Sequence, residues 1–330
     1  MAAYFGGNRS LDRVFPGVVL FGPRPATTLR LHSLSNTIST MSFKKAFQTK
    51  DFVVTAELPL KPDSSRKTLL SDAQRLGDGI DGILLTDNQY GQPHMTPLAA
   101  ANILQSGDYN PILQLSCRNR NRVALLGELL GARALGVDSL LLIRGGALPE
   151  GFQPRPMAVT DTDAKDLIAS ARMIDDDEGV NGGSDFLIAT SAAVHDPAPD
   201  WVPEELMAKA TSGAQLVFTQ ICVDVNILRR YMAALISQKL LQRLSVIVSV
   251  AVMTSPEIAA WFREHRRGTL IPPDWVDRFT SGTFTSSDGI NLCGKLVADI
   301  ATIPGVSGVN FVVSENIDAI SQVLETAGKL

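Results

Sequence analysis

The amino-acid sequence predicts an α/β fold, a single (β/α)8 barrel of the TIM-barrel type. From about residue 50 onward, short apolar runs alternate with longer segments of helical pattern. Eight such runs fall within about 280 residues, which is the usual size of this barrel. An open sheet that binds a dinucleotide would instead show a GxGxxG turn after its first strand. Here the first run leads into "ELPLKPD", which contains no glycine, so the barrel is favoured.

The eight expected strands share one composition. Each is short, mostly apolar and bounded by Gly, Pro, Asp or Asn, which is typical of strands buried on both faces of a parallel sheet. Their alternation with helices implies parallel pairing through right-handed crossovers. The strands are expected at Phe52–Glu57, Gly82–Thr86, Pro111–Leu115, Ser139–Ile143, Asp185–Ser191, Ala214–Gln220, Ser245–Val250 and Gly308–Val313.

Helical patterns fill the segments between these strands. In Arg122–Leu135 the apolar residues recur with a period near 3.6 residues, as on one face of a helix. Thr160 and Asp161 are N-cap candidates for a helix after the fourth strand. Ser255, followed by Pro256, marks the start of another helix.

Composition excludes several classes of protein. The chain has 330 residues, of which 45% are hydrophobic and 19% charged, so a large core is expected and global disorder is not. The net charge of −4 argues against a nucleic-acid surface. The three cysteines are far apart and show no metal-ligand spacing, which predicts a reduced, cytoplasmic protein without bound metal. No apolar run is long enough for a membrane span, and a homo-oligomer is compatible with the sequence.

The first 45 residues differ from the rest and are expected to form a flexible extension before a barrel domain at residues 46–330. Residues 1–40 contain four arginines, several Ser and Thr, and one acid. This composition fits a transit peptide, or an unstructured leader upstream of a start at Met41.

Polar residues end several of the otherwise apolar strands. A buried polar group without a partner costs about 1–3 kcal/mol, so these residues need an explanation. In (β/α)8 barrels the chemistry lies at the carboxyl ends of the strands, where these residues are expected to meet. They are Glu57, Thr86 with Asp87, Gln114, Arg144 with Gly145 and Gly146, Ser191 with His195, and Gln220.

Glu57 is the most informative of these residues. It ends the run "FVVTA" at the mouth of an apolar barrel, where desolvation favours the neutral, protonated carboxyl. A carboxyl kept protonated in this way suits a general acid. The structural alternative is a glutamate that caps its strand through backbone amides or pairs with Lys61.

The other strand ends carry groups that suit ligand binding, each with a structural alternative. The amide of Gln220 offers one acceptor and two donors to a heterocycle, or it bridges neighbouring strand ends. Arg144 can reach a phosphate or carboxylate where the following glycines let backbone approach a ligand. The arginines of "CRNRNR" bind an anion or form a solvated helix start. His195 is either a cofactor contact or a hydrogen-bonded structural residue.

Longer motifs then point to a known family. They are "LTDNQYGQPHMTPLAAA", "LQLSCRNRNRVALLGELLGARALGVDSLLLIRGG", "AAVH", "ATSGAQLVFTQICVDVNILRRYM" and "LIPPDWVDRF". Together with the strand ending in Glu57, they resemble the methylenetetrahydrofolate reductase family. Its members are (β/α)8 barrels that usually bind FAD. They pass a hydride from NADH or NADPH through the flavin to 5,10-methylenetetrahydrofolate, a folate of one-carbon metabolism and methionine biosynthesis.

The resemblance implies a role for each strand-end residue. Glu57 is implied as the acid that protonates the folate and opens its five-membered ring. Gln220 matches the glutamine that contacts the pterin, and Gln114 and Asp87 are expected beside the substrate. The positions implied at the flavin are Thr86, Arg144, Gly145, Gly146, Ser191, His195 and Lys209.

Three positions depart from the family pattern. Gly146 stands where an Asp is usual, Gln114 where a His is usual, and Ser191 where a Tyr is usual. Three interpretations follow: a reductase with a rebuilt flavin site in which Asp87 or another acid substitutes, a flavin-independent reductase that takes hydride directly from NAD(P)H, or a folate-binding paralogue without turnover. An unrelated barrel aldolase would need a Schiff-base lysine at a strand end, and no expected strand ends in lysine.

Overall fold

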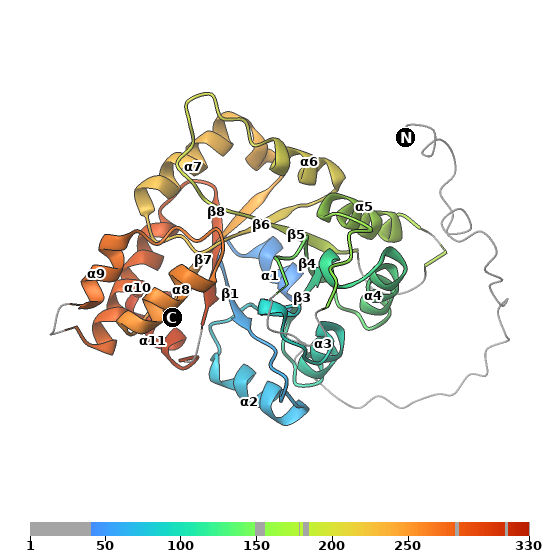
Figure 1. Ribbon diagram of the computed structural model, residues 1–330, viewed down its shortest axis with the longest axis horizontal. Coiled ribbons are helices and arrows are strands. Elements are labelled where there is room, and N and C mark those ends of the chain that lie inside the picture. Colours follow the sequence, from blue (N-terminus) through green and yellow to red (C-terminus); the bar gives the residue numbers. More distant parts are fainter. Residues whose placement is uncertain are drawn as a thin grey trace.

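The chain folds into a closed barrel of eight parallel strands that follow one another in sequence order (Figure 1). The computed structural model describes residues 41–148, 156–177, 179–180, 185–280, 284–313 and 316–329. The strands are β1 Val53–Leu58, β2 Gly82–Leu85, β3 Pro111–Ser116, β4 Ser139–Ile143, β5 Leu187–Ala192, β6 Leu216–Thr219, β7 Ser245–Ala251 and β8 Val306–Val312. Each expected strand is present, with ends no more than two residues from those expected. The predicted fold class is therefore confirmed.

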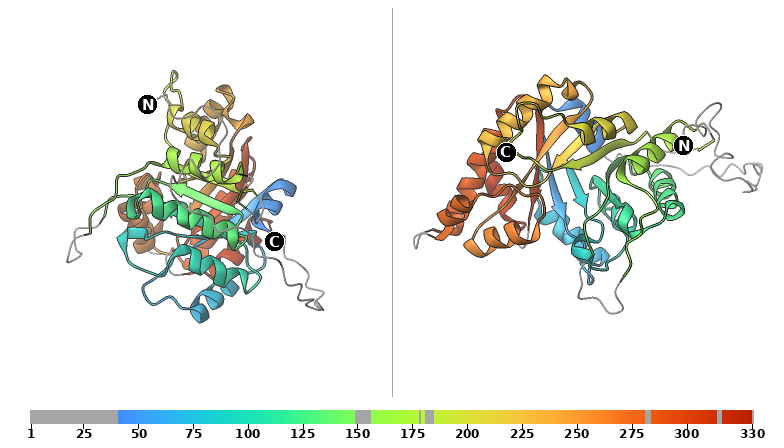
Figure 2. Two further views of the ribbon diagram at one scale, coloured as in Figure 1. Left: turned by 90° about the vertical axis from the view of Figure 1, so that its right-hand side faces the viewer. Right: turned by 45° about the horizontal axis from the view of Figure 1, so that its top comes forward.

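Helices surround the barrel on its outer side, except α1, which lies at the centre behind the strands in Figure 1 (Figures 1 and 2). They are α1 Phe43–Thr49, α2 Arg66–Arg75, α3 Pro97–Gln105, α4 Arg122–Ala134, α5 Ala164–Asp175, α6 Glu204–Ser212, α7 Val225–Ser237, α8 Pro256–His265, α9 Pro273–Thr280, α10 Ser286–Ala301 and α11 Ala319–Thr326. Short 3-10 turns lie at η2 Gln89–Gly91, η3 Cys117–Asn119 and η4 Leu240–Gln242.

Two helix starts test the expected caps. Ser255 caps α8 as predicted, because its hydroxyl accepts from the backbone N–H of Ile258. The cap of α5 is Asp163, which accepts from the first-turn N–H groups, so the prediction of Thr160 or Asp161 was wrong. Asp161 instead accepts from the backbone N–H of Arg122 at 2.6 Å, at the start of α4.

The core has two layers, as the alternation of side chains along each strand requires. The larger layer lies between the strands and the surrounding helices. The smaller one fills the barrel interior with residues from seven strands and α1: Phe43, Val53, Leu84, Ile112, Leu141, Leu187, Ala189, Leu216, Phe218 and Ile247.

Helix α1 contributes to the inner layer through the fully buried ring of Phe43. The domain boundary expected between residues 45 and 46 therefore falls inside this helix. Residues 1–40, the rest of the expected extension, lie outside the described residues.

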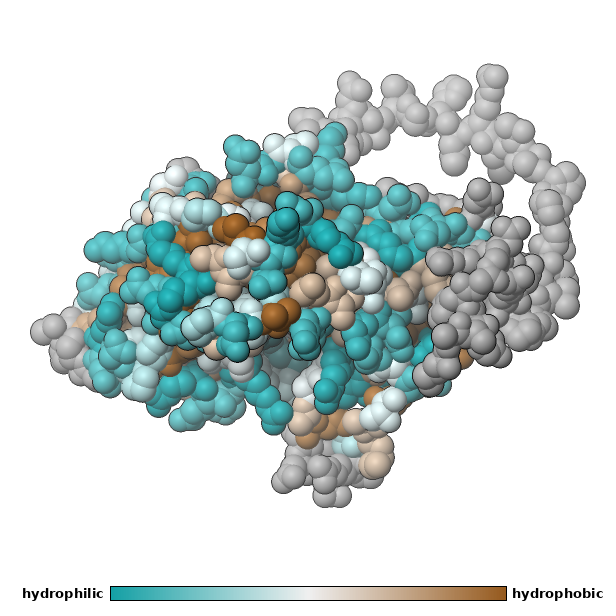
Figure 3. Space-filling view, turned by 90° about the horizontal axis from the view of Figure 1, so that it is seen from above, coloured by the Kyte–Doolittle hydropathy of each residue, from teal (hydrophilic) through white to brown (hydrophobic). Residues whose placement is uncertain are grey.

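The face of the molecule in view in Figure 3 shows no large apolar patch. Figure 3 shows hydrophilic residues over most of the side in view, with hydrophobic side chains in small groups between them. None of the helices in the described part of the chain is long and apolar enough to cross a membrane. Cys117, Cys222 and Cys293 are free and buried. No group of three or more His, Cys, Asp or Glu side chains in the described ranges is placed to hold a metal ion.

Candidate active site

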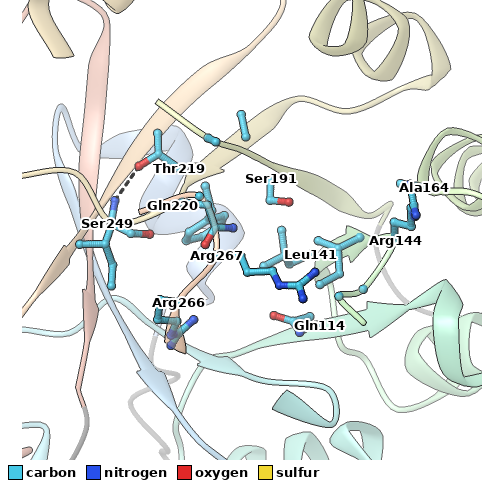
Figure 4. A pocket seen from close by; sticks show the side chains of 18 of the residues that line it. Gln114, Leu141, Arg144, Ala164, Ser191, Thr219, Gln220, Ser249, Arg266 and Arg267 are labelled. Atoms are coloured by element: carbon cyan, nitrogen blue, oxygen red, sulfur yellow. Dashed lines mark hydrogen bonds between the residues drawn. The ribbon is translucent and has the colours of Figure 1, made fainter. Parts of the chain in front are cut away.

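A cavity of about 1040 Å³ opens at the carboxyl ends of the strands (Figure 4). Its volume lies at the top of the range of small-molecule sites, about 300–1,000 Å³. Ten of the eleven predicted site residues line it, and the exception is Thr86. The ten are Glu57, Asp87, Gln114, Arg144, Gly145, Gly146, Ser191, His195, Lys209 and Gln220.

The pleat of the strands explains why these side chains meet. Val53 lies in the inner layer, and side chains of one strand alternate between the two faces, so Glu57 also points inward. The same alternation places Gln114 two residues after Ile112, and Ser191 two residues after Ala189. Closure of the barrel then brings these inward side chains to one rim.

Glu57 is buried at this rim and forms an ion pair with Arg266. The contact is bidentate: Nη2 of Arg266 donates to Oε2, and Nη1 donates to Oε1 at 3.3 Å. The expected apolar surroundings of the carboxyl are therefore incorrect, because a guanidinium is in direct contact with it. The predicted alternative partner, Lys61, is exposed and does not pair with Glu57 among the described residues.

Arg266 is enclosed by the turn that follows β2. Its guanidinium lies over the ring of Tyr90, with Cζ 5.9 Å from the ring centroid. With its amide oxygen facing the guanidinium, Gln89 accepts from Nη1 and Nη2 at 2.8 and 2.7 Å. Burial lowers the pKa of Arg266, but Glu57 and Tyr90 more than offset this effect and the pKa is raised. Burial also raises the pKa of Tyr90.

The segment between α8 and α9 positions Arg266 and the next residue, Arg267. Gly268 has a φ of +75°, in the region that favours glycine, and a Cβ there would lie 3.3 Å from side-chain atoms of both Ala193 and Gln220. The Arg267 side chain extends from this segment across the mouth of the barrel toward Gln114 (Figure 4). Neither arginine stands at a strand end, so the strand pattern did not indicate them. The one signal was the basic pair before a glycine in "HRRG".

Gln114 and Gln220 offer amide groups to the cavity. Gln114 is buried, and Gln220 is half-buried at the end of β6. Neither side-chain amide hydrogen-bonds to any residue that the structure describes, although the backbone N–H of Gln220 donates to Ala192 O at 2.7 Å. The proposed bridge from Gln220 to a neighbouring strand end is therefore not formed by its side chain. Both amides are free to bind a ligand.

Asp87 lines the cavity, but its carboxylate is already engaged. Arg120 donates to Oδ2 at 2.7 Å and to Oδ1 at 3.1 Å, and the backbone N–H of Ser116 donates to Oδ2 at 2.7 Å. Burial lowers the pKa of Arg120, yet the contacts with Asp87 outweigh it and raise the pKa. This geometry gives Asp87 a structural role between β2 and β3. It does not support the expectation that Asp87 replaces the acid missing at position 146.

The other two arginines of "CRNRNR" have structural surroundings instead of forming an anion site. Arg118 donates to the carbonyl oxygens of Gly146 at 2.9 Å and Asn88 at 3.0 Å. Arg122 is exposed at the start of α4, as the structural alternative predicted. Arg118 thus connects the ends of β2 and β4, and the run does not form an anion site of its own.

The β4 side of the cavity is less occupied. The side chain of Arg144 has no hydrogen-bond or ion-pair partner among the described residues and points away from the centre of the mouth (Figure 4). Gly145 has a φ of +87°, and a Cβ there would overlap the Ser116 hydroxyl. A Cβ on Gly146 would meet no atom within 4 Å. Only the first of the two glycines is therefore required by packing.

The β5 side carries Lys209 and His195. Lys209 is buried on α6 and donates to Ser191 O at 2.9 Å, and it pairs with Glu205 at 2.7 Å. The His195 ring packs edge-on against Trp201 and Tyr231, at 4.7 and 5.4 Å between centroids. Thr86 is buried, and its hydroxyl has no hydrogen-bond partner in the described part of the chain.

These residues fit a planar, anionic cofactor such as FAD or a nicotinamide dinucleotide. The guanidinium of Arg144, which has no partner in the described part of the chain, suits a phosphate, and the open space beside Gly146 lets a ring approach the backbone. The departures remain visible: Ser191 contributes a hydroxyl where a ring is usual, and position 146 contributes no acid.

Comparisons with known proteins found the following similarities. A structure titled as an uncharacterized protein from Clostridium thermocellum that binds two copies of 5-methyl-5,6,7,8-tetrahydrofolic acid is 13% identical, with a TM-score of 0.60 over 86% of this chain and 97% of that one. DmoA from Hyphomicrobium sulfonivorans is 11% identical, with a TM-score of 0.49 over 84% of this chain and 89% of that one. A comparison with curated proteins gave no match.

The strongest of these findings is a sequence match that covers nearly the whole described chain. The family model for Methylenetetrahydrofolate reductase matches residues 42–328, from the residue before α1 to the residues after α11. Since this match spans far more than half of the sequence, the chain belongs to the methylenetetrahydrofolate reductase family.

Proposed function

We propose that the protein reduces 5,10-methylenetetrahydrofolate to 5-methyltetrahydrofolate with NADH or NADPH, and that Glu57 is its general acid. The observation that carries this proposal is the position of Glu57, an inward carboxylate at the rim of a cavity that also presents the free amides of Gln114 and Gln220. The fold is shared with the Clostridium thermocellum protein that binds 5-methyl-5,6,7,8-tetrahydrofolic acid, which supports a pterin as the ligand.

In the proposed reaction, Glu57 and the two amides have different roles. Opening the five-membered ring of the substrate needs a proton at an amine nitrogen, and a carboxyl at the rim can deliver it. The two amides can pair with the mixed donor and acceptor edge of the pterin. To donate a proton, Glu57 must first bind one, so its ion pair with Arg266 must loosen when the substrate arrives.

The residues implied at the flavin would hold FAD on the β4–β5 side of the cavity. When bound, FAD supplies the relay of hydride from the nicotinamide to the folate. Arg144 would contact its phosphates, and Gly145, Gly146, Ser191, His195 and Lys209 line the same region. The missing acid at position 146 and the missing ring at position 191 favour a second candidate, direct hydride transfer from NAD(P)H without flavin. A third candidate is folate binding without turnover.

The three free, buried cysteines are consistent with a cytoplasmic location, where thiols stay reduced. The proposed partners are the folate substrate and, as an open possibility from the sequence, further copies of the chain.

The proposal is tested by comparing wild type with Glu57→Gln and with Glu264→Gln, an exposed glutamate on α8 outside the cavity. Oxidation of NADH and NADPH is followed with 5,10-methylenetetrahydrofolate, with and without added FAD. Glu57→Gln should lower turnover by about 10²-fold or more while pterin binding persists, and Glu264→Gln should match wild type.

Each alternative result has a clear meaning. Wild type that binds 5-methyltetrahydrofolate but oxidises neither nicotinamide would overturn the reductase and leave a folate-binding protein. Full activity in Glu57→Gln would overturn the acid assignment alone. The visible spectrum of the purified protein separates the two reductase candidates, because bound flavin absorbs there and nicotinamide does not.

A further inference from the structure

Two consecutive arginines between α8 and α9 have different surroundings. Arg266 is engaged by Glu57, Gln89 and Tyr90, which contact its two terminal nitrogens and its face, although its Nε has no hydrogen-bond partner among the described residues. The guanidinium of Arg267 lines the same cavity but forms no hydrogen bond or ion pair with any residue in the described ranges. Its side chain extends over Leu141 and Gln114 at the centre of the mouth and stays open to solvent (Figure 4).

The backbone that carries Arg267 is anchored on both sides. Before it, the N–H of Arg266 donates to Phe262 O at 3.0 Å and so continues from α8. After it, Leu270 exchanges backbone hydrogen bonds with the segment that follows β6: its N–H donates to Ile221 O at 2.8 Å, and its carbonyl accepts from Val223 at 3.1 Å. Arg267 is therefore presented to the cavity by a backbone fixed at both ends.

The side chains near Arg267 do not neutralise it. Gln114, Leu141 and Ser191, which surround the centre of the mouth in Figure 4, are uncharged. Four of the five acids on the lining are engaged: Glu57 by Arg266, Asp87 by Arg120, Asp163 as a helix cap, and Glu205 by Lys209. The fifth, Glu204, is exposed in the first turn of α6 and forms no ion pair with Arg267. Position 146, where the family usually has an acid, is glycine. A guanidinium in this position lacks the anion that such groups bind through paired hydrogen bonds.

We propose that Arg267 binds an anionic group of the ligand and so positions it over the rim that carries Glu57. Carboxylate and phosphate share the flat pair of oxygens that a guanidinium recognises. Two sources present this chemistry: the glutamate part of the folate and the phosphates of the nicotinamide dinucleotide. This inference rests on the proposed function, because both sources are ligands of that reaction.

The test measures equilibrium dissociation constants for four ligands on four proteins. The ligands are 5-methyltetrahydrofolate, the same pterin without its glutamate, NADH and NADPH. The proteins are wild type, Arg267→Gln, Arg267→Lys and Arg263→Gln, the last an exposed arginine of α8 outside the cavity. Thermal unfolding of each variant is recorded, and no change is expected because Arg267 is exposed.

Arg267→Gln should weaken binding of the ligand that carries the anion by about tenfold or more, as expected for a lost hydrogen bond to a charged group. The affinity of Arg267→Lys should lie between those of wild type and Arg267→Gln, because lysine keeps the charge but loses the paired donors. Arg263→Gln should match wild type. If the folate supplies the anion, removal of its glutamate weakens binding to wild type but leaves binding to Arg267→Gln unchanged. If the dinucleotide supplies it, only NADH and NADPH respond.

Arg267→Gln binding every ligand within twofold of wild type would overturn this inference and leave the proposed reductase intact. An equal loss for the pterin with and without glutamate, with no loss for the dinucleotides, would also overturn it. Wild type that binds none of the four ligands would overturn both proposals.

Discussion

On the β1–β2 side of the barrel mouth, Glu57, Arg266, Gln89 and Tyr90 contact one another, and each charge meets its opposite. On the β4 side, Arg144 has no partner within the described residues, and Gly146 faces open space. The β1–β2 side thus pairs its opposite charges within the protein. The β4 side presents a guanidinium without a partner among the described residues, and room for a ring.

The two sides of the cavity therefore differ in whether their charged groups are paired within the protein. On the paired side, Arg266 fixes the position of the Glu57 carboxylate, and under the proposed function this ion pair must loosen before Glu57 can donate a proton. The open side leaves its contacts to be completed by a cofactor or substrate. The departures from the family pattern at positions 146 and 191 both lie on the open side, whereas Glu57 on the paired side is retained.

The largest effect is expected when the paired side is broken. Arg266→Met would leave the buried carboxylate of Glu57 without its cation and should lower the free energy of unfolding by roughly 3 kcal/mol. The double variant Arg266→Met with Glu57→Gln should recover most of this loss, because the buried charge is then removed as well. Chemical denaturation of wild type and the two variants measures both the loss and the recovery. If the double variant is no more stable than Arg266→Met, the ion pair does not hold this rim.

The adjacent residues Gly145 and Gly146 on the β4 side should respond differently to substitution. Gly145→Ala should lower the free energy of unfolding by about 1–3 kcal/mol, because of its positive φ and the overlap with Ser116. Gly146→Ala should change it by no more than about 0.5 kcal/mol. Thermal unfolding compares the pair directly. Equal losses would show that position 146 is also confined by packing.

The smallest effect concerns two buried thiols: Cys117 lies next to the end of β4, and Cys222 pairs with Leu270 of the segment that carries Arg266. Burial raises the pKa of Cys117, after β3, to about 11 and that of Cys222, after β6, to about 12, from the ordinary 9.0. Both should react slowly with a thiol reagent in the folded protein. Cys117 should react severalfold faster, since it lies next to the less constrained side. Mass spectrometry of partially labelled protein gives the two rates, and a faster Cys222 would contradict the comparison.

The same shifts predict a loss of stability in alkali. Unfolded thiols ionise near pH 9, whereas the buried ones stay protonated until about pH 11 to 12. The thiols therefore contribute their full stabilisation below pH 9, and it falls as pH rises through the folded pKa values. Unfolding curves between pH 8 and pH 11 should show this decrease.

The fold could be predicted from the sequence because both faces of every strand are buried. A strand of this kind appears as a continuous apolar run, and all eight runs were recognisable. Their polar ends could be assigned to one rim for the same reason. Strand ends are marked by a change of composition, and closure of the barrel brings them together.

The partners of those residues could not be predicted in this way. Arg266 reaches Glu57 across 209 positions of sequence, from a segment with no strand or helix pattern of its own. In sequence, Asp87 cannot be distinguished from the other polar residues that end strands, but in the structure its carboxylate accepts hydrogen bonds from Arg120. Charge pairing between segments depends on the three-dimensional path of the chain between elements, which composition and periodicity do not encode.

The anchoring of Leu270 beside Ile221 and Val223 has a consequence for how this barrel can diverge. A short segment between α8 and α9 carries Arg266 and Arg267 to the mouth and belongs to none of the eight strands. Exchange of that segment between related proteins could change what the mouth accepts without rebuilding the core. In this architecture the ends of the strands fix the position of the site, whereas the sequence of the α8–α9 segment can change which ligand the site binds.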